Sequence, residues 1–344
     1  MKNNFTIIFI LLSIITLSAQ STKGITGKPD TGFTTYKAFK DIKKSHPNVA
    51  LSLVEDKIPP SVSEQRNIVY ANIGDRPLHL DAFYPKKKTK KVNSAILIIH
   101  GGGWRTGNRT QHIPLAQHLA ALGYACFTVE YRLSTEALYP AAVHDLKAAI
   151  RWMRANAKTY NIDTNRIATL GFSAGGQLSA LLGTTGDNPI LEGTVGILGY
   201  STKVNAVIDI DGILAFIHPE SGEGDDSRST SAATNWFGYS KTENPDVWNQ
   251  ASALTHVSEQ TPPTLLLNSG VDRMHAGRED YRKKLDTFKI YSEVHTFTDA
   301  PHSFCLFNPW FELTLKYVSD FLKKILRSNF AENSAGPVLC TLTP

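Results

Sequence analysis

Residues 171–175 read GFSAG and place Ser173 in the pattern G-x-S-x-G. Residues 165–171 have the pattern of a strand, and the residues from Ala174 onward suit a helix. A sharp turn from strand to helix exposes the serine hydroxyl above the sheet, and the flanking positions need glycine because a Cβ would clash. The N-terminus of the helix favours negative charge beside the serine. The pattern predicts Ser173 as a nucleophile, although alone it also fits a closely packed helix start.

A second segment suited to acyl transfer reads HGGGW, residues 100–104, and directly follows an apolar strand pattern. Three consecutive glycines cost backbone entropy, so we expect their N–H groups to serve a nearby group. The tetrahedral intermediate of acyl transfer carries an oxyanion that needs such donors. We assign the oxyanion donors to Gly102, Gly103 and Ala174, the residue after the nucleophile. We expect Trp104 to line the pocket and His100 to brace the loop.

A serine nucleophile needs a histidine base, which an acid orients. On a sheet of the type argued below, the chain order is nucleophile, acid, base. Of the histidines His275, His295 and His302, the last lies in a loop before the final helical pattern, where it can reach over the edge of the sheet. His295 lies inside a strand pattern, and His275 lies too close to the favoured acid. We therefore predict His302 as the base.

The acid is predicted to be Asp272, which follows the strand pattern 263–270 and would face the His302 loop. Asp211, at the end of the strand pattern 204–211, is the alternative. Asp299 lies three residues before His302 and is expected to shape that loop.

Short apolar strands alternate with helical patterns around these residues. Strand patterns occupy residues 67–74, 78–85, 94–100, 124–132, 165–171, 204–211, 263–270 and 293–299. Helical patterns occupy residues 112–123, 141–158, a run from Ala174 and Phe311 to Leu326. This alternation predicts an α/β fold with a mostly parallel central sheet and helices on both faces.

The alternation is interrupted at 213–262, a long irregular insertion of the kind that forms lids or binding loops. The acidic stretch 222–227 within it is expected to be solvated rather than a calcium site. We predict a leader at 21–64 that wraps the body, a catalytic domain at 65–330, and a loosely held tail at 331–344.

The motifs together resemble those of α/β-hydrolase carboxylesterases. The resemblance rests on HGGGW, on residues 130–163 and on GFSAGG, and it is nearest to the bacterial feruloyl and acetyl-xylan esterase group. It covers about residues 65–328 and implies Ser173, Asp272 and His302 as the triad. Residues 207–220, 234–240, 271–280 and 301–311 resemble a subgroup of secreted Bacteroidetes-type esterases tied to plant or algal polysaccharides.

The resemblance implies a serine esterase that removes acetyl, methyl or feruloyl groups from polysaccharides. A general carboxylesterase or lipase-like hydrolase, or a peptidase of the same fold, is the alternative. A non-catalytic binding protein is a third interpretation, but every catalytic role has a residue here. We expect the ester of a polysaccharide or oligosaccharide as the binding partner.

Substrate-binding residues are predicted near the site: Trp104, Arg273, His275 and Trp310. Arg273, His275 and Arg278 could bind an anionic sugar such as a uronate, because arginine pairs with carboxylates. The aromatic residues of 304–311 could stack on a sugar ring. The alternative is that Arg278 pairs with Glu279 or Asp280 and that the aromatic side chains pack in the core.

Composition is ordinary for a globular protein: 42% of the 344 residues are hydrophobic, 19% are charged, and the net charge is +5. The lysines at 86–88 and 90–91 are expected on a solvated loop, and no basic stripe with interleaved aromatic residues predicts nucleic-acid binding. We expect neither a metal nor a nucleotide cofactor, because the chain has no metal-ligand spacing and no glycine-rich phosphate loop.

The first residues are typical of a secretory signal peptide at 1–20. Lys2 precedes an apolar run over 5–17, and Leu17-Ser18-Ala19 offers a small-residue cleavage site. We expect the protein to be secreted or periplasmic, with no membrane association after cleavage.

Overall fold

The strands of the structure, a computed structural model that describes residues 19–87 and 92–327, form one eight-stranded sheet and one two-stranded pair. Their bounds are β1 Ser52–Leu53, β2 Val62–Ile73, β3 Arg76–Pro85, β4 Asn93–Ile99, β5 Ala125–Val129, β6 Ile162–Phe172, β7 Ala206–Ile210, β8 Thr264–Asn268, β9 Ser292–Thr296 and β10 Phe307–Asn308. The large sheet has the order β2-β3-β5-β4-β6-β7-β8-β9, and β1 pairs with β10. The hairpin β2-β3 joins β5 antiparallel, whereas the strands from β5 to β9 run parallel.

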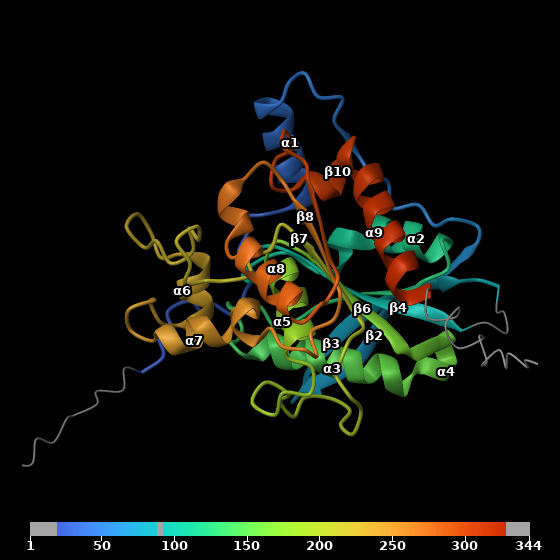
Figure 1. The fold of residues 1–344 in the computed structure, drawn as a ribbon, viewed down its shortest axis with the longest axis horizontal. Helices are drawn as coiled ribbons and strands as arrows, with labels where there is room; N and C mark the ends of the chain where they lie inside the picture. Colours follow the sequence, from blue (N-terminus) through green and yellow to red (C-terminus); the bar gives the residue numbers. More distant parts are fainter. Residues whose placement is uncertain (1–18, 88–91, 328–344) are drawn as a thin grey trace, which may run out of the picture.

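Helices cover both faces of the large sheet (Figure 1). Their bounds are α1 Thr35–Ser45, α2 Ile113–Ala121, α3 Ala141–Ala155, α4 Ala157–Tyr160, α5 Ala174–Thr184, α6 Ala232–Phe237, α7 Pro245–Gln250, α8 Arg278–Thr287 and α9 Trp310–Arg327. One hydrophobic cluster joins the sheet to α3, α5 and α8, and a second joins it to α1, α2 and α9. The predicted architecture, a mostly parallel sheet between two helical layers, is confirmed.

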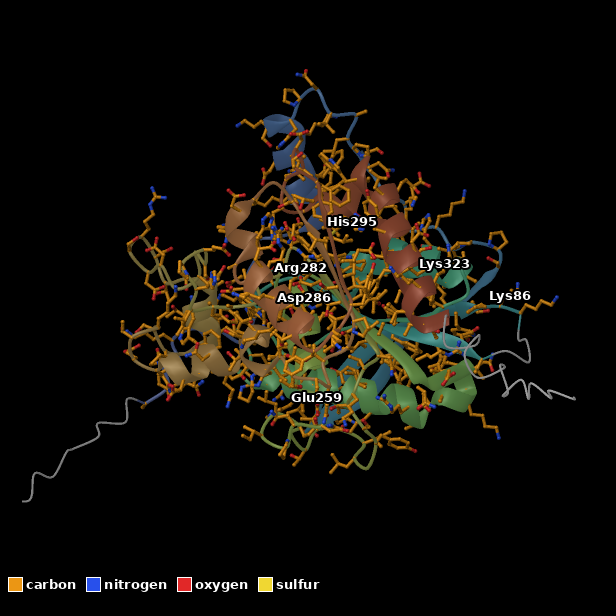
Figure 2. The ribbon with its side chains drawn as sticks, in the orientation of Figure 1. Lys86, Glu259, Arg282, Asp286, His295 and Lys323 are labelled. Atoms are coloured by element: carbon orange, nitrogen blue, oxygen red, sulfur yellow. The ribbon has the colours of Figure 1, made fainter. Side chains whose placement is uncertain are left out.

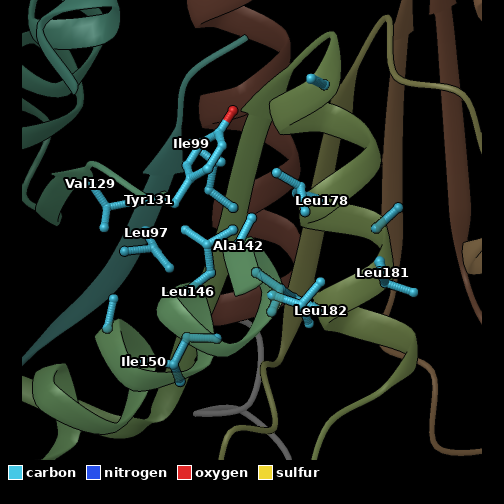
Figure 3. Close-up of a cluster of buried hydrophobic side chains, with 14 of the residues drawn as sticks. Leu97, Ile99, Val129, Tyr131, Ala142, Leu146, Ile150, Leu178, Leu181 and Leu182 are labelled. Carbon is cyan, nitrogen blue, oxygen red and sulfur yellow. The ribbon is translucent and has the colours of Figure 1, made fainter. Parts of the chain in front are cut away.

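The central strand β4 shows why the sheet is covered on both sides. Its side chains alternate between the faces, as in any strand. Leu97 and Ile99 belong to the cluster with α3, where Leu146 lies beside them (Figure 3). Their neighbours Ile96 and Ile98 belong to the opposite cluster. All four strand residues are buried, and each contributes on the order of 1.5–3 kcal/mol by leaving water.

The parallel strands point their carboxyl ends toward one edge of the sheet. The segments that follow β4, β6, β7, β8 and β9 therefore meet there, and they contain the residues predicted to do chemistry. In open α/β sheets, ligands bind at this edge. The topology thus brings together side chains that are more than a hundred residues apart in the chain.

The segment before β2 wraps over the body and is hydrogen-bonded to it. Gln20 Nε2 donates to the Phe237 carbonyl at 2.8 Å, and the Ser21 N–H donates to the Gly238 carbonyl at 2.7 Å. Further along, α1 buries Ala38 and Ile42. Since β2 begins at Val62, the body starts slightly before the expected boundary at residue 65.

The insertion 213–262 is packed against the body rather than loose. It contains α6 and α7 and buries four aromatic side chains completely: Phe216, Trp236, Phe237 and Trp248. Phe237 and Trp248 lie with ring centroids 4.5 Å apart, and Phe216 packs against both. These rings form a small aromatic core of their own, continuous with the larger cluster on that face of the sheet.

Some predictions fall outside the described residues. The signal-peptide residues 1–18 and the tail 331–344 are among them, as are lysines 88, 90 and 91. Lys86, which is described, is exposed and lies away from α6 and α7 (Figure 2). Among the described helices, none combines the length and the apolar character needed to cross a membrane.

Candidate active site

The turn at Ser173 has the geometry that its neighbours predicted. Ser173 has φ 57° and ψ −123°, and its N–H donates to the Ile210 carbonyl at 2.8 Å. A Cβ on Gly171 would lie 2.0 Å from the Gly175 carbonyl oxygen, and one on Gly175 would lie 2.2 Å from the Ile99 carbonyl oxygen. Only glycine fits both positions, so the backbone passes from β6 into α5 within one residue.

His302 bridges Ser173 to a buried carboxylate. Its Nε2 lies 2.8 Å from Ser173 Oγ, and its Nδ1 lies 2.8 Å from Asp211 Oδ2. Asp211 is fully buried, and its Oδ1 accepts the Ser269 N–H at 2.7 Å. With Nδ1 donating to Asp211, Nε2 is left as the acceptor for the serine hydroxyl. This is the geometry of a nucleophile, a base and an orienting acid.

The prediction of Asp272 as the acid is wrong, because Asp211 occupies that position. Asp272 begins the 3-10 helix Asp272–His275, is exposed, and lines a separate cavity with Arg278 and Glu279. The reason is the spacing from the strand ends. Asp211 follows the last residue of β7 directly and has φ 54°, whereas three residues separate Asp272 from the end of β8. At Asp272 the chain has therefore already turned away from the edge of the sheet.

The other histidines considered as the base bind elsewhere. His295 in β9 lies 2.6 Å from Glu293 Oε1 through its Nε2 and stacks on Tyr317 at 3.8 Å (Figure 2). His275 Nε2 lies 2.9 Å from the Ser269 carbonyl oxygen. Only His302 of the three contacts the serine, as the sequence analysis predicted.

The glycine loop after β4 lies opposite the serine. Gly102 has φ +126°, and a Cβ there would lie 2.3 Å from the Thr106 carbonyl oxygen, so the tight loop requires glycine. No hydrogen bond within residues 19–87 and 92–327 uses the N–H of Gly102 or Gly103. The N–H of Ala174, in the first turn of α5, has no partner within its helix. All three residues line the same cavity as Ser173 and His302.

That cavity has a volume of about 360 Å³ and opens beside the triad. Its inner wall is largely apolar: Trp104, Phe172, Ile213, Ala232 and Met274. Trp104 is positioned from two sides, since its Nε1 donates to Gln177 Oε1 at 3.0 Å and its ring stacks on Trp236 at 4.8 Å. Trp104 therefore walls the pocket, as expected, and the insertion holds it there.

The leader supplies part of the same wall. Asp30, Gly32 and Phe33 line the cavity. Asp30 Oδ2 accepts from Arg105 Nε at 2.6 Å, and the Phe33 carbonyl accepts from Thr106 Oγ1 at 3.2 Å. These contacts tie the leader to the glycine loop that carries two of the predicted oxyanion donors, Gly102 and Gly103.

Of the three basic residues predicted to bind a uronate, only Arg273 lines the cavity beside Ser173, and all three line a separate cavity. Arg278 pairs with Glu279 at 2.8 Å and donates to Asn268 Oδ1, so the alternative interpretation of Arg278 holds. His275 and Arg278 line the separate cavity, and Trp310 is not part of the wall of the cavity beside Ser173. Arg273 lines the cavity beside Ser173, where its Nη1 lies 3.5 Å from Glu223 Oε1.

The aromatic residues after His302 are core residues rather than a sugar platform. Phe304, Phe307 and Phe311 are buried in the cluster with α9, which is the second half of the alternative interpretation. Trp310 packs against the same cluster.

Among the residues of the pocket that sequence reasoning missed, Gln177 and Glu223 are polar and lie beside the triad or its wall. Gln177 is fully buried one turn into α5 and links Trp104 to the Ala251 carbonyl. Glu223 lies in the acidic stretch predicted to be solvated, yet its side chain is only 16% exposed and lines the cavity. The spacing of Gln177 from Ser173, four residues along the helix, was the available signal for the first. Nothing in the local sequence distinguishes Glu223 from its acidic neighbours.

A family model, BD-FAE, matches residues 80–276, which is more than half of the chain. The chain belongs to the BD-FAE family. The match begins in β3 and ends just after the 3-10 helix Asp272–His275. It therefore includes the glycine loop after β4, Ser173 and Asp211.

Curated relatives of this BD-FAE chain carry esterase names. It is 30% identical over 218 residues to "Esterase LipC" of Mycobacterium tuberculosis, covering 60% of this chain and 51% of that protein. It is 34% identical over 149 residues to an arylesterase of Saccharolobus solfataricus, covering 43% of this chain and 46% of that protein. The chain thus spans about half the length of the curated relatives it matches.

Solved structures share the fold of this BD-FAE chain. A truncated carbohydrate esterase from gut microbiota superposes with a TM-score of 0.64 at 24% identity, covering 79% of this chain and 98% of that one. A bifunctional GH43-CE protein of Bacteroides eggerthii gives 0.64 at 26% identity, covering 78% and 39%. With the family match, these likenesses confirm the predicted α/β-hydrolase fold and the resemblance to the carbohydrate esterase group.

His100 supports the glycine loop that follows β4, as the sequence predicted. Its Nδ1 lies 2.9 Å from the Gly101 carbonyl oxygen, and its ring stacks on Tyr131 at 4.4 Å. Burial lowers the pKa of His100 to about 4, so it stays neutral at physiological pH. A neutral, buried imidazole suits a structural brace and not a general base.

Proposed function

We propose that this protein is a serine esterase that hydrolyses acyl esters on carbohydrate alcohols through an acyl-enzyme. The observation that carries the proposal is the hydrogen-bonded series from Ser173 through His302 to the buried Asp211, beside an open cavity. The esterase names of the curated relatives support the reaction type. The carbohydrate esterase among the structural neighbours is the basis for proposing a sugar as the alcohol.

The geometry supports a two-stage reaction. Ser173 Oγ attacks the ester carbonyl carbon while its proton moves to His302 Nε2, and the carbonyl oxygen becomes negative. The N–H groups of Gly102, Gly103 and Ala174 are placed to receive that oxygen. The bond to the alcohol then breaks, and His302 gives its proton to the departing alcohol oxygen. Water repeats the sequence on the acyl-serine and releases the acid.

Asp211 orients the base. It is held by the Ser269 N–H on one oxygen and by His302 Nδ1 on the other. The charge of Asp211 stabilises the imidazolium that forms during each proton transfer.

The test is hydrolysis of p-nitrophenyl acetate by the wild type and by Ser173→Ala. We expect a loss of turnover on the order of 10⁶-fold, because the triad acts as a unit. His295→Ala is the matched control, since within the described residues the His295 side chain hydrogen-bonds Glu293 and stacks on Tyr317, and it does not contact Ser173. A Ser173→Ala variant that kept wild-type turnover would overturn the proposal.

A general carboxylesterase of small apolar esters is the second candidate, and the apolar inner wall of the cavity favours it. Acetylated xylan and acetylated pectin, compared with p-nitrophenyl butyrate, separate the two. Preference for the polysaccharide esters supports the carbohydrate assignment.

We also propose that the protein is exported, on the evidence of the apolar run over 5–17 and the small residues at 17–19. Mass spectrometry of the native protein is expected to find an N-terminus near Ala19 to Ser21. A mature chain that still carried residues 5–17 would show this proposal to be wrong.

A further inference from the structure

Glu223 is a carboxylate in the wall of the active cavity without a hydrogen-bond donor. Its side chain is 16% exposed, and its nearest cationic atom is Arg273 Nη1 at 3.5 Å. Within the described residues, no N–H or O–H group donates a hydrogen bond to this carboxylate. A carboxylate removed from water needs donors, and the folded chain does not supply them here. Burial accordingly raises the pKa of Glu223, while Arg273, Lys241 and His302 oppose that rise.

Arg273 likewise has N–H groups that make no hydrogen bond within the described residues. It is 54% exposed, lines the same cavity, and donates no hydrogen bond within residues 19–87 and 92–327. A guanidinium carries several N–H donors in one plane. Glu223 and Arg273 thus present acceptors and donors side by side, and their formal charges cancel.

The position of this pair decides which part of an ester it would meet. His302 must give its proton to the departing alcohol oxygen, so the alcohol lies against His302. Glu223 lies within electrostatic range of His302 and shares its cavity. The apolar surfaces of Trp104 and Ile213 line the same cavity and need no hydrogen-bond partner from the substrate. The pair therefore faces the alcohol portion of the substrate.

We propose that Glu223 accepts, and Arg273 donates, hydrogen bonds to free hydroxyls that flank the ester on an uncharged sugar. This inference rests on the proposed esterase function and adds the alcohol class. Adjacent sugar hydroxyls offer both a donor and an acceptor, and they complete the bonds that the chain leaves open. A sugar carboxylate in the same place would meet Glu223 as a like charge and is disfavoured.

Model esters that differ in their free hydroxyls or in a carboxylate test the pair. The substrates are a methyl xyloside with one acetyl group and two free hydroxyls, the same compound with both hydroxyls methylated, and a mono-acetylated methyl glycoside of galacturonic acid with its carboxylate free. Each is assayed with the wild type, Glu223→Gln and Glu223→Ala. The matched control is Glu259→Gln, an exposed glutamate that is not part of the cavity wall (Figure 2).

We expect kcat/KM of Glu223→Ala on the free-hydroxyl xyloside to fall about 10- to 100-fold, the loss typical of a hydrogen bond to a charged group. The loss should be distinctly smaller on the methylated xyloside, and Glu223→Gln should fall between the wild type and Glu223→Ala. The wild type should prefer the xyloside to the galacturonate, and this preference should shrink in both variants. Glu259→Gln should match the wild type throughout.

The outcomes separate this inference from the esterase proposal. Suppose that the wild type hydrolyses p-nitrophenyl acetate and that Glu223→Ala loses the same factor in kcat/KM on both xylosides. This result would overturn the recognition of hydroxyls and leave the esterase proposal standing. Wild type that prefers the galacturonate would overturn it as well. Wild type inactive on every ester would instead refute the proposed function.

Discussion

Asp211 and Asp272 both follow a strand that points at the site, but only Asp211 reaches His302. Asp211 is buried and bonds to His302 Nδ1, whereas Asp272 is exposed in another cavity. We expect Asp211→Asn to lower kcat on p-nitrophenyl acetate about 10⁴-fold, because an amide there favours the wrong tautomer of His302. Asp272→Asn should stay within about twofold of the wild type, as a surface change does. The opposite order of losses would return the acid role to Asp272.

The raised pKa of Glu223 also predicts how the stability of the protein depends on pH. This pKa is raised above the ordinary value of 4.5, chiefly by burial. The folded state therefore holds the proton more tightly than the unfolded state, and the wild type loses stability as pH rises through the window between the two pKa values. Glu223→Gln does not titrate, so its melting temperature should exceed that of the wild type at about pH 8.

At about pH 4, where Glu223 is largely protonated in both states, the two proteins should melt at closely similar temperatures. Scanning calorimetry at the two pH values measures the difference, with Glu259→Gln as the exposed control. A variant less stable than the wild type at the higher pH would mean that Glu223 stabilises the fold through its charge.

The turn at Ser173, the histidine that contacts it and the tight glycine loop were predictable, because each is fixed by its immediate neighbours. Gly171 and Gly175 signal the turn, and three glycines signal the loop. The acid and Glu223 were not predictable in this way. Each depends on a distant partner: Asp211 on the reach of the His302 loop, and Glu223 on the return of the insertion to Arg273.

At the scale of elements, the passage from β6 to α5 tolerates no extra atom. A Cβ on Gly175 would lie 2.2 Å from the Ile99 carbonyl oxygen of β4, and neither backbone can move freely in the sheet core. Gly175→Ala should therefore destabilise the fold by at least about 1–3 kcal/mol, the usual cost of overpacking. Thermal unfolding measures it. Gly32→Ala, where a Cβ meets nothing within 4 Å, is the control and should melt near the wild type.

The strands and helices themselves were largely predictable from periodicity, because their apolar residues repeat at the spacing of the element. The insertion was not, since 213–262 has no such period. Its order comes from packing between distant rings, with Trp236 stacked on Trp104 and Phe237 against Tyr139. Such contacts follow from the assembled fold and leave no local pattern.

At the scale of the whole molecule, the leader is part of the active cavity. Removing residues 19–33 deletes Asp30, Gly32 and Phe33 from its wall and leaves the triad untouched. We expect KM on p-nitrophenyl acetate to rise severalfold, with a smaller change in kcat, because binding is lost more than catalysis.

A shorter truncation, of residues 19–25, keeps those three wall residues. It removes the contacts of Gln20 and Ser21 near α6 and the Gly24 carbonyl that accepts from Arg105 Nη1 at 3.4 Å. Its KM should stay close to that of the full chain. Steady-state kinetics on the two truncated chains measures the difference, and equal KM values for both would show that the leader does not shape substrate binding.

The stacked indoles of Trp104 and Trp236 give this molecule a built-in optical reporter. Their planes lie 4° from parallel with centroids 4.8 Å apart, close enough for the two electronic transitions to couple. Coupled indoles whose transition dipoles are inclined to each other produce a paired positive and negative band in far-ultraviolet circular dichroism, which a single indole does not. Trp104 lines the cavity while Trp236 belongs to the insertion, so a ligand that shifts one ring against the other changes this coupling. We therefore expect circular dichroism to report a ligand that displaces either ring, without a label and without turnover.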